Sequence, residues 1–344
     1  MRRGQAASQP SPLHVPLRTA RTDQALAPLR VLSLTGGGYR GVFTGEVLVR
    51  LCAATKCEGS LEDVFDVFAG TSIGGLIACA LAVGVAPRAV LQTIEKHGGH
   101  VFPPKRHRTA RRAIFGTLYD SSHLEDAIDE CLGPKKDLKL RDLQKGLVVP
   151  AVDWVGGRTH IFVSGFLGKA YATDATLREL CLATSAAPTY FKPKQVDGAP
   201  MLDGGLSMNN PDVLALTEVA RRWPERLPQL EMLSIGTAGA DAPRDPRGAE
   251  KKGLAWVKTL PEYMMLVQER TASAQAARVL GRRYLRVNYT EGRDAAFLDL
   301  DVANDRARFT LLDAAKATAT AAYRKHRTFI DRMLNKSVAK PIRG

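Results

Sequence analysis

The sequence has few cysteines and none of the spacings that bind metals. Its five cysteines are dispersed over 344 residues, and no C-x-x-C pair occurs. An odd number of scattered cysteines indicates neither a zinc site nor a disulfide framework. It is typical of reduced thiols in the core of a cytoplasmic protein, so we expect no metal. The cysteines are Cys52, Cys57, Cys79, Cys131 and Cys181.

Long apolar runs are also lacking. The stretch that comes nearest to the ~18 residues of a membrane span covers residues 67–86, and four glycines interrupt it. The N-terminus has no apolar segment of the kind found in signal peptides. Residues 1–28 are rich in Ser, Pro, Ala and Arg, which predicts a disordered basic arm. We therefore expect a cytoplasmic protein without a membrane span.

Acidic residues are fewer than basic ones. The chain has 35 acidic and 49 basic residues, a net charge of +14, which attracts anionic partners such as nucleic acid or anionic lipid. No zinc finger, RNP aromatic pattern or basic-zipper heptad accompanies this charge, so we expect no specific nucleic-acid partner. The basic clusters at 105–112, 278–286 and 324–327 are equally well interpreted as solvated faces.

The elements that can be predicted alternate between strands and helices. A strand at 31–34 precedes a Gly-rich segment and a helix at 42–54, and a strand at 64–69 precedes an apolar helix. This order predicts an α/β fold with a parallel sheet. We expect one catalytic domain over residues 29–344, ending in a helical part. Further strands are expected at 147–152, 159–163, 201–203, 230–235 and 284–287, and helices at 87–97, 121–131, 177–184, 211–222, 254–281 with a break at Pro261, and 306–334.

A Gly-x-Ser-x-Gly motif spans Gly70 to Gly74, directly after the second predicted strand. A serine on a strand-to-helix turn is exposed, and flanking glycines allow the backbone to bend sharply around it. The N-terminus of the following helix can stabilise a negative charge that develops nearby. Ser72 is therefore a candidate nucleophile. The alternative is a Gly-rich βα turn that contains an incidental serine.

A second glycine-rich turn follows the first strand. Gly36, Gly37 and Gly38 can direct several backbone N–H groups toward one point, as in an oxyanion hole. With Gly41 the segment also satisfies the dinucleotide fingerprint G-x-G-x-x-G. That fingerprint needs an acidic residue at the end of the second strand. Since that strand ends at the serine motif instead, the dinucleotide interpretation is disfavoured.

The base that would activate Ser72 has two candidates. In the order of an α/β-hydrolase triad, His326 alone among the seven histidines lies late enough, but its neighbours are basic and typical of a solvated helix face. Asp203 ends a predicted strand before Gly204 and Gly205. A partly desolvated carboxylate has a raised pKa and can serve directly as the base, so Asp203 is favoured. The alternative is an aspartate that merely begins a turn.

These segments, in this order, resemble the patatin-like phospholipases. The resemblance rests on Gly36–Gly41, Gly70–Gly74 and Asp203–Gly205, and on matching blocks at 183–191 and 209–211. It covers about residues 30–240, and it implies a three-layer α/β/α fold with a mainly parallel central sheet and catalysis without a cofactor. Thr35 departs from the pattern, since many members carry Asp there; the change should alter contacts around the loop rather than the reaction.

The resemblance also implies a mechanism. Asp203 would take the proton of Ser72, which would attack a lipid ester carbonyl, and water would release a fatty acid from the acyl-enzyme. Backbone N–H groups around Gly37 and Gly38 would hold the oxyanion. The rest of the oxyanion loop would be Gly36 and Arg40, with Arg40 as structural or electrostatic support.

The residues in the motif blocks are similar to those of bacterial patatin effectors of antiphage signalling systems. This implies activation by a cyclic dinucleotide and action on a phospholipid membrane surface, with the protein peripheral at the inner membrane. A constitutive lipid acyl hydrolase and a catalytically idle patatin-fold binding module are the alternatives. The basic segment 101–120, with two phenylalanines, could be a lid, a membrane contact or part of a ligand site, and a homo-oligomer remains open.

Overall fold

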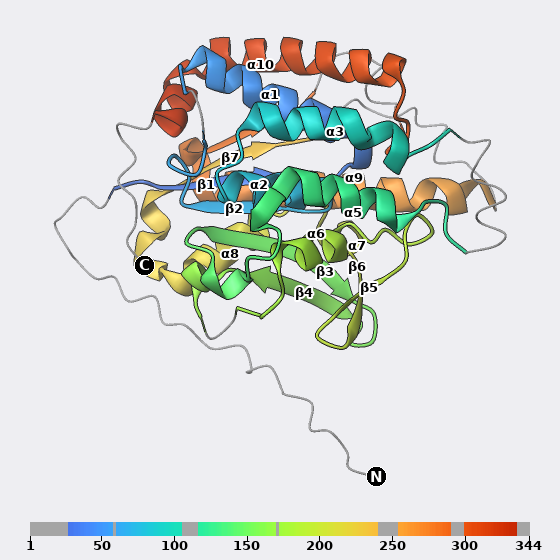
Figure 1. Cartoon of the computed structure of the whole chain (residues 1–344). Coiled ribbons are helices and arrows are strands. Elements are labelled where there is room, and N and C mark those ends of the chain that lie inside the picture. Colours follow the sequence, from blue (N-terminus) through green and yellow to red (C-terminus); the bar gives the residue numbers. More distant parts are fainter. Residues whose placement is uncertain are drawn as a thin grey trace, which may run out of the picture.

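The computed structural model describes residues 27–57, 60–104, 116–169, 172–239, 254–289 and 299–335. Its strands form an eight-stranded sheet in the order β5-β6-β3-β2-β1-β7-β8, and β4 also pairs with β3 (Figure 1). The described residues exclude 1–26 of the predicted N-terminal arm and 105–115 of the basic segment. The strands are β1 (Leu29–Leu34), β2 (Val67–Gly70), β3 (Gly146–Asp153), β4 (Arg158–Val163), β5 (Lys194–Val196), β6 (Ala199–Asp203), β7 (Leu230–Ile235) and β8 (Tyr284–Val287).

The centre of the sheet is parallel and one side is antiparallel. β1 pairs in parallel with β2 and β7, β2 with β3, and β7 with β8. β4 and β6 run antiparallel to β3, and β5 runs antiparallel to β6. The prediction of an α/β fold with a mainly parallel sheet is confirmed.

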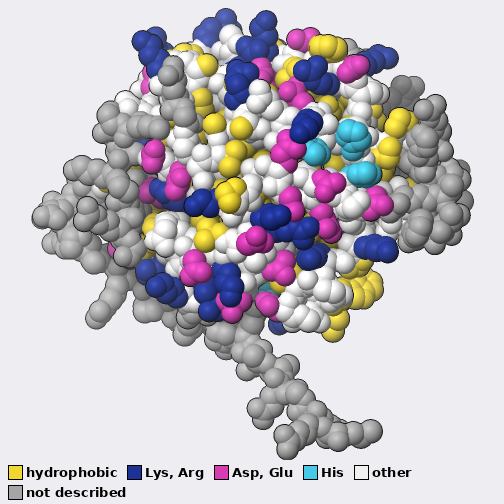
Figure 2. Space-filling view, in the orientation of Figure 1, with side chains coloured by type: hydrophobic (Ala, Val, Ile, Leu, Met, Phe, Trp, Pro, Cys, Tyr) yellow, Lys and Arg dark blue, Asp and Glu magenta, His cyan; other side chains and the backbone are white. Residues whose placement is uncertain are grey.

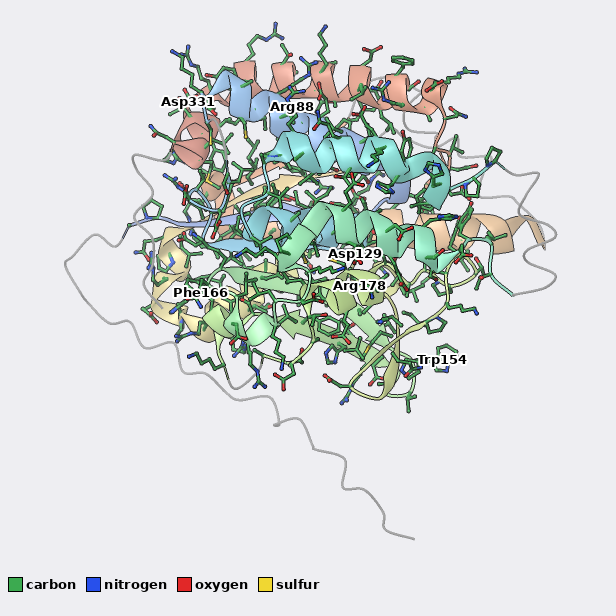
Figure 3. The ribbon with its side chains drawn as sticks, viewed as in Figure 1. Arg88, Asp129, Trp154, Phe166, Arg178 and Asp331 are labelled. Carbon is green, nitrogen blue, oxygen red and sulfur yellow. The ribbon has the colours of Figure 1, made fainter. Side chains whose placement is uncertain are left out.

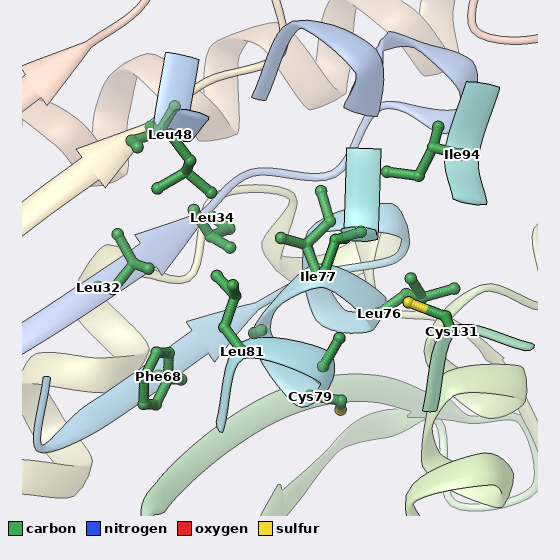
Figure 4. Packing of buried hydrophobic residues seen from close by; sticks show 14 of the residues in the cluster. Leu32, Leu34, Leu48, Phe68, Leu76, Ile77, Cys79, Leu81, Ile94 and Cys131 are labelled. Atoms are coloured by element: carbon green, nitrogen blue, oxygen red, sulfur yellow. The ribbon is translucent and has the colours of Figure 1, made fainter. Parts of the chain in front are cut away.

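Each strand of the sheet sends alternate side chains to opposite faces, and both faces are covered. On one face Leu32, Leu34 and Phe68 join the larger apolar core (Figure 4). On the other, Val31 and Val67 pack in a second core with helix α8 (Asp212–Arg222). Helices on both faces make the three layers that were expected. The helices of the first face are α1 (Gly41–Ala54), α2 (Ile73–Ala82), α3 (Pro87–Val101), α5 (Ser121–Leu132), α6 (Leu177–Thr184) and α10 (Asp305–Leu334).

Local signals explain where several helices begin and end. α6 spans the predicted residues because Thr176 and Glu179 form a capping box, which satisfies backbone N–H groups of the first turn.

The predicted break at position 261 is wrong, since α9 (Leu254–Leu280) continues through it. A proline within a helix costs about 3 kcal/mol. The later part of α9 is fixed to a neighbouring segment, since the Asn210 amide donates a hydrogen bond of 2.9 Å to the Ser273 hydroxyl.

Helix α3 packs on the glycine-rich turn that follows β1, through Gly98. A Cβ atom at Gly98 would stand 2.1 Å from Cε2 of the buried Tyr39 ring, whereas a Cβ at Gly99 would meet nothing nearer than 3.9 Å. Gly98 is therefore required for close approach of the helix to the turn, and Gly99 is not.

We predict opposite effects for alanine at these adjacent positions. Gly98→Ala should lower the free energy of unfolding by about 1–3 kcal/mol, because the new methyl group overlaps a rigid buried ring. Gly99→Ala should raise it by up to about 1 kcal/mol, because alanine is the better helix former. Urea unfolding of the two variants measures both values, and equal changes of the same sign would contradict the packing described.

Candidate active site

Ser72 lies on a sharp turn between β2 and α2. Its backbone has φ 53° and ψ −125°, a left-handed conformation that is rare for a residue with a side chain. A Cβ on Gly70 would stand 2.1 Å from the carbonyl oxygen of Gly74, and one on Gly74 would stand 2.4 Å from that of Leu34. Both glycines of the motif are needed for this turn. The expected strand, turn and helix are present.

The structure brings Asp203 to Ser72 from 131 residues away. The Ser72 hydroxyl donates a hydrogen bond of 2.7 Å to Oδ2 of Asp203, and the backbone N–H of Gly205 donates one of 2.7 Å to Oδ1. Burial raises the pKa of the Asp203 carboxyl to about 6, although both hydrogen bonds act in the opposite direction. The carboxyl thus titrates in the range in which a general base works.

Thr184 connects the two segments, a role that the sequence analysis did not assign. Its hydroxyl accepts a hydrogen bond from the backbone N–H of Ser72 (3.0 Å) and donates one to the carbonyl of Pro150 (2.7 Å). Its own carbonyl accepts from the N–H of Gly204. The fully buried Thr184 therefore positions both the serine turn and the aspartate turn. Thr184 belongs to the 183–191 block, and that match to the family was the one sequence signal that could have pointed to it.

The glycine loop lies against the serine. A Cβ on Gly36 would stand 3.4 Å from Cβ of Ser72, and one on Gly37 would stand 2.4 Å from Oγ1 of Thr237. Gly38 has φ +57°, which favours glycine. In the described part of the chain, the N–H groups of Gly37 and Gly38 have no hydrogen-bond acceptor. These two groups are available to bind an oxygen.

The loop is held by hydrogen bonds from three other segments. The N–H of Gly36 donates to the carbonyl of Asn209 (3.0 Å), and the Thr237 hydroxyl donates to the carbonyl of Gly36 (3.0 Å). The N–H of Tyr39 donates to the carbonyl of Leu300 (2.8 Å). Gly41, the last glycine, contacts Ile73, since a Cβ there would stand 2.4 Å from Cγ1 of that residue. The loop is therefore fixed before any substrate binds.

A buried ionic network supports the base of this loop. Nη1 of Arg286 donates to the hydroxyls of Thr35 and Ser234, both at 2.8 Å, and Nη2 donates to the carboxylate of Glu269. Nη2 of Arg40 and Oε2 of Glu269 both lie within 4.0 Å of the Cβ position of Gly239. Arg40 is thus directed toward this network, and Thr35, the departure noted in the sequence, is bonded to Arg286.

His326, the other candidate base, lies on α10 and not on β6 with Asp203. His326 sits on α10, where its φ and ψ depart from helical values. Burial and the neighbouring Lys325 lower its pKa. The hydrogen-bond partner of the Ser72 hydroxyl is a carboxylate and not an imidazole.

Charged side chains on the face shown in Figure 2 are interspersed by sign. Arg178 bonds to Asp129 (2.7 Å) and Glu125 (2.8 Å), and Lys136 also bonds to Asp129 (2.7 Å).

Within the described ranges, no group of His, Cys, Asp and Glu could hold a metal ion. The described helices include none that is long and apolar enough to cross a membrane.

Comparison with known proteins gives the family. A sequence model described as patatin-like phospholipase matches residues 32–216. A cGAMP-activated phospholipase of Vibrio cholerae is 32% identical, with 69% of this chain and 72% of that protein covered. One of Escherichia coli is 33% identical, with 65% and 66% covered. VipD from Legionella pneumophila aligns with a TM-score of 0.45 at 14% identity, covering 88% of this chain and 68% of that one. The chain belongs to the patatin-like phospholipase family and is a lipid acyl hydrolase.

Proposed function

We propose that this phospholipase works through a Ser72–Asp203 dyad. The observation that supports it most is the 2.7 Å hydrogen bond from the Ser72 hydroxyl to a buried carboxylate whose pKa is about 6. A serine hydroxyl is a weak nucleophile until a base takes its proton. The ionised Asp203 is already placed to accept that proton as Ser72 attacks the ester carbonyl of a phospholipid.

The loop from Gly36 to Arg40 then stabilises the tetrahedral intermediate. The unoccupied N–H groups of Gly37 and Gly38 lie on a loop that abuts Ser72, and each donor aimed at an oxyanion is typically worth about 10²–10³ in rate. The protonated Asp203 returns its proton to the leaving alcohol. It then removes a proton from water, which attacks the acyl-enzyme, and passes that proton to the Ser72 oxygen as the fatty acid is released. No step needs a cofactor.

We predict that the two dyad residues are both required for turnover. Ser72→Ala should reduce fatty-acid release from phospholipid vesicles to the background rate. Asp203→Asn should lower kcat by about 10²–10⁴, because the amide cannot accept the proton. His326→Ala is the matched control and should stay near the wild-type rate. Full activity in Asp203→Asn would contradict the dyad, and loss of activity in a folded His326→Ala would favour a triad.

We further propose that a cyclic dinucleotide activates the enzyme, as an antiphage effector that degrades the membrane of its own cell. The support is that the two bacterial relatives compared above are named cGAMP-activated phospholipases. The net charge of +14 also suits a ligand that carries two phosphates and an anionic membrane surface. The enzyme would then act as a peripheral protein at the inner membrane. The intact dyad geometry disfavours an idle binding module.

We predict that fatty-acid release depends on one ligand. The purified protein, incubated with phospholipid vesicles, should be nearly inactive alone and should become active with one member of a cyclic-dinucleotide panel that includes cyclic GMP–AMP. Light scattering on the same samples measures whether activation changes the number of copies in the assembly. Equal activity with and without every nucleotide would contradict the regulated effector and leave a constitutive phospholipase.

A further inference from the structure

Helix α9 exposes a stripe of large apolar side chains. Leu260, Tyr263, Met264 and Val267 are 44%, 40%, 51% and 45% exposed. Their spacing of three, one and three residues places them on one face of the helix. A soluble helix normally turns such a face toward the core, but this one faces outward. We call these four residues the α9 stripe.

The α9 stripe lies at the edge of the sheet that carries the serine and aspartate turns. α9 leads into β8, which is parallel to β7, so the helix begins beyond the carboxyl ends of the strands. The residues just after the stripe are level with the aspartate turn, because Gln268 donates to the carbonyl of Leu206 (3.3 Å). The stripe therefore projects past the aspartate turn. Figure 1 shows α9 extending outward at one end of the sheet. Leu206, three residues after Asp203, is itself 47% exposed.

A second apolar tip projects at the same edge. Trp154 and Val155, in the turn between β3 and β4, are 68% and 77% exposed. Asp203 pairs with Ala151 in β3, so Trp154 lies three residues farther out along that strand, or about 10 Å beyond the aspartate. Figure 3 shows Trp154 at the outer end of this turn. Two unrelated elements thus present apolar side chains beyond the active site.

Charge favours an anionic surface through the whole chain, since the charges next to the two projections are balanced in sign. From 260 to 271 the sequence of α9 has Glu262, Glu269 and Arg270, and Glu269 is paired with Arg286. Beside the hairpin tip, Arg158 is paired with Asp153. Lys194 on β5 is level with Asp153, and Asp197 follows three residues later in the turn to β6. The net charge of +14 attracts the protein as a whole to an anionic bilayer, and the apolar side chains of the two projections can then enter it.

We propose that the α9 stripe and the Trp154–Val155 tip are the surface by which the protein docks on an anionic phospholipid bilayer. This inference rests on the proposed function, since it supplies the route by which lipid reaches Ser72. A flat bilayer contacts both projections at once, with the apolar side chains entering the interface. Trp and Tyr are the residues that favour that depth. Docking in this orientation turns the carboxyl edge of the sheet, and with it the dyad, toward the ester bonds.

Vesicle binding tests the surface without catalysis. In a Ser72→Ala background, the protein is sedimented with sucrose-loaded vesicles of phosphatidylcholine containing a quarter of phosphatidylglycerol. Met264→Asp with Val267→Asp should weaken the partition by about tenfold or more, because burial of these side chains is lost and a charge must enter the interface. Trp154→Asp should weaken it independently. Val279→Asp is the matched control, since Val279 is 51% exposed near the far end of the same helix, and it should bind like the parent.

Activity distinguishes a failure of docking from a failure of the proposed dyad. With Ser72 restored and any required nucleotide present, the docking variants should lose vesicle hydrolysis in step with binding. They should keep the parent rate on a dissolved short-chain ester, which needs no membrane.

Unchanged vesicle binding in both the α9 and the Trp154 variants would overturn the docking surface. Full ester turnover in Ser72→Ala would instead overturn the dyad. A dimer that only the α9 substitutions dissociate, with vesicle binding unchanged, would identify the stripe as an interface between copies and also overturn the proposal.

Discussion

The hydrogen bond between Ser72 and Asp203 is the contact on which the rest of the site depends. Its two partners are 131 residues apart in the sequence, and a misplacement of about 1 Å in a catalytic group can cost about 10² in rate. The parallel strands bring the serine turn to one edge of the sheet. The antiparallel return of β6 along β3 brings Asp203 to the same edge, opposite Ala151. Thr184 then joins the two turns by hydrogen bonds.

The electrostatics of the site follow from burial. Asp203 is a buried carboxylate, and desolvation of its charge raises its pKa toward neutrality. The hydrogen bonds from Ser72 and Gly205 keep it from rising further. Beneath the glycine loop, the ion pair of Arg286 and Glu269 spans β8 and α9, elements that lie outside the matched residues 32–216. The C-terminal part of the chain therefore supports the loop physically.

Local sequence signals predicted the parts of the fold that local physics determines. The alternation of strands and helices, the glycine motifs and the strand-ending Asp203 all have short-range causes, such as periodicity and turn geometry. The three-residue strand β5 was not predicted, because so short a segment has no periodicity of its own. The break expected at position 261 was wrong, since α9 continues through it, and a proline alone does not tell a helix end from a helix interior. The roles of Thr184 and Arg286 depend on partners far away in the sequence, and no local pattern reveals them.

In the proposed mechanism the Asp203 carboxylate takes the proton of Ser72 directly. The most direct test is the rate at which a soluble fluorophosphonate labels Ser72, followed by mass spectrometry as a function of pH. Only the ionised carboxylate accepts a proton, so the rate should be constant above about pH 7 and fall about tenfold per unit below the pKa of about 6. The Asp203→Asn protein should be labelled slowly at every pH. A rate at pH 5 equal to that at pH 8, or labelling at another residue, would contradict the account.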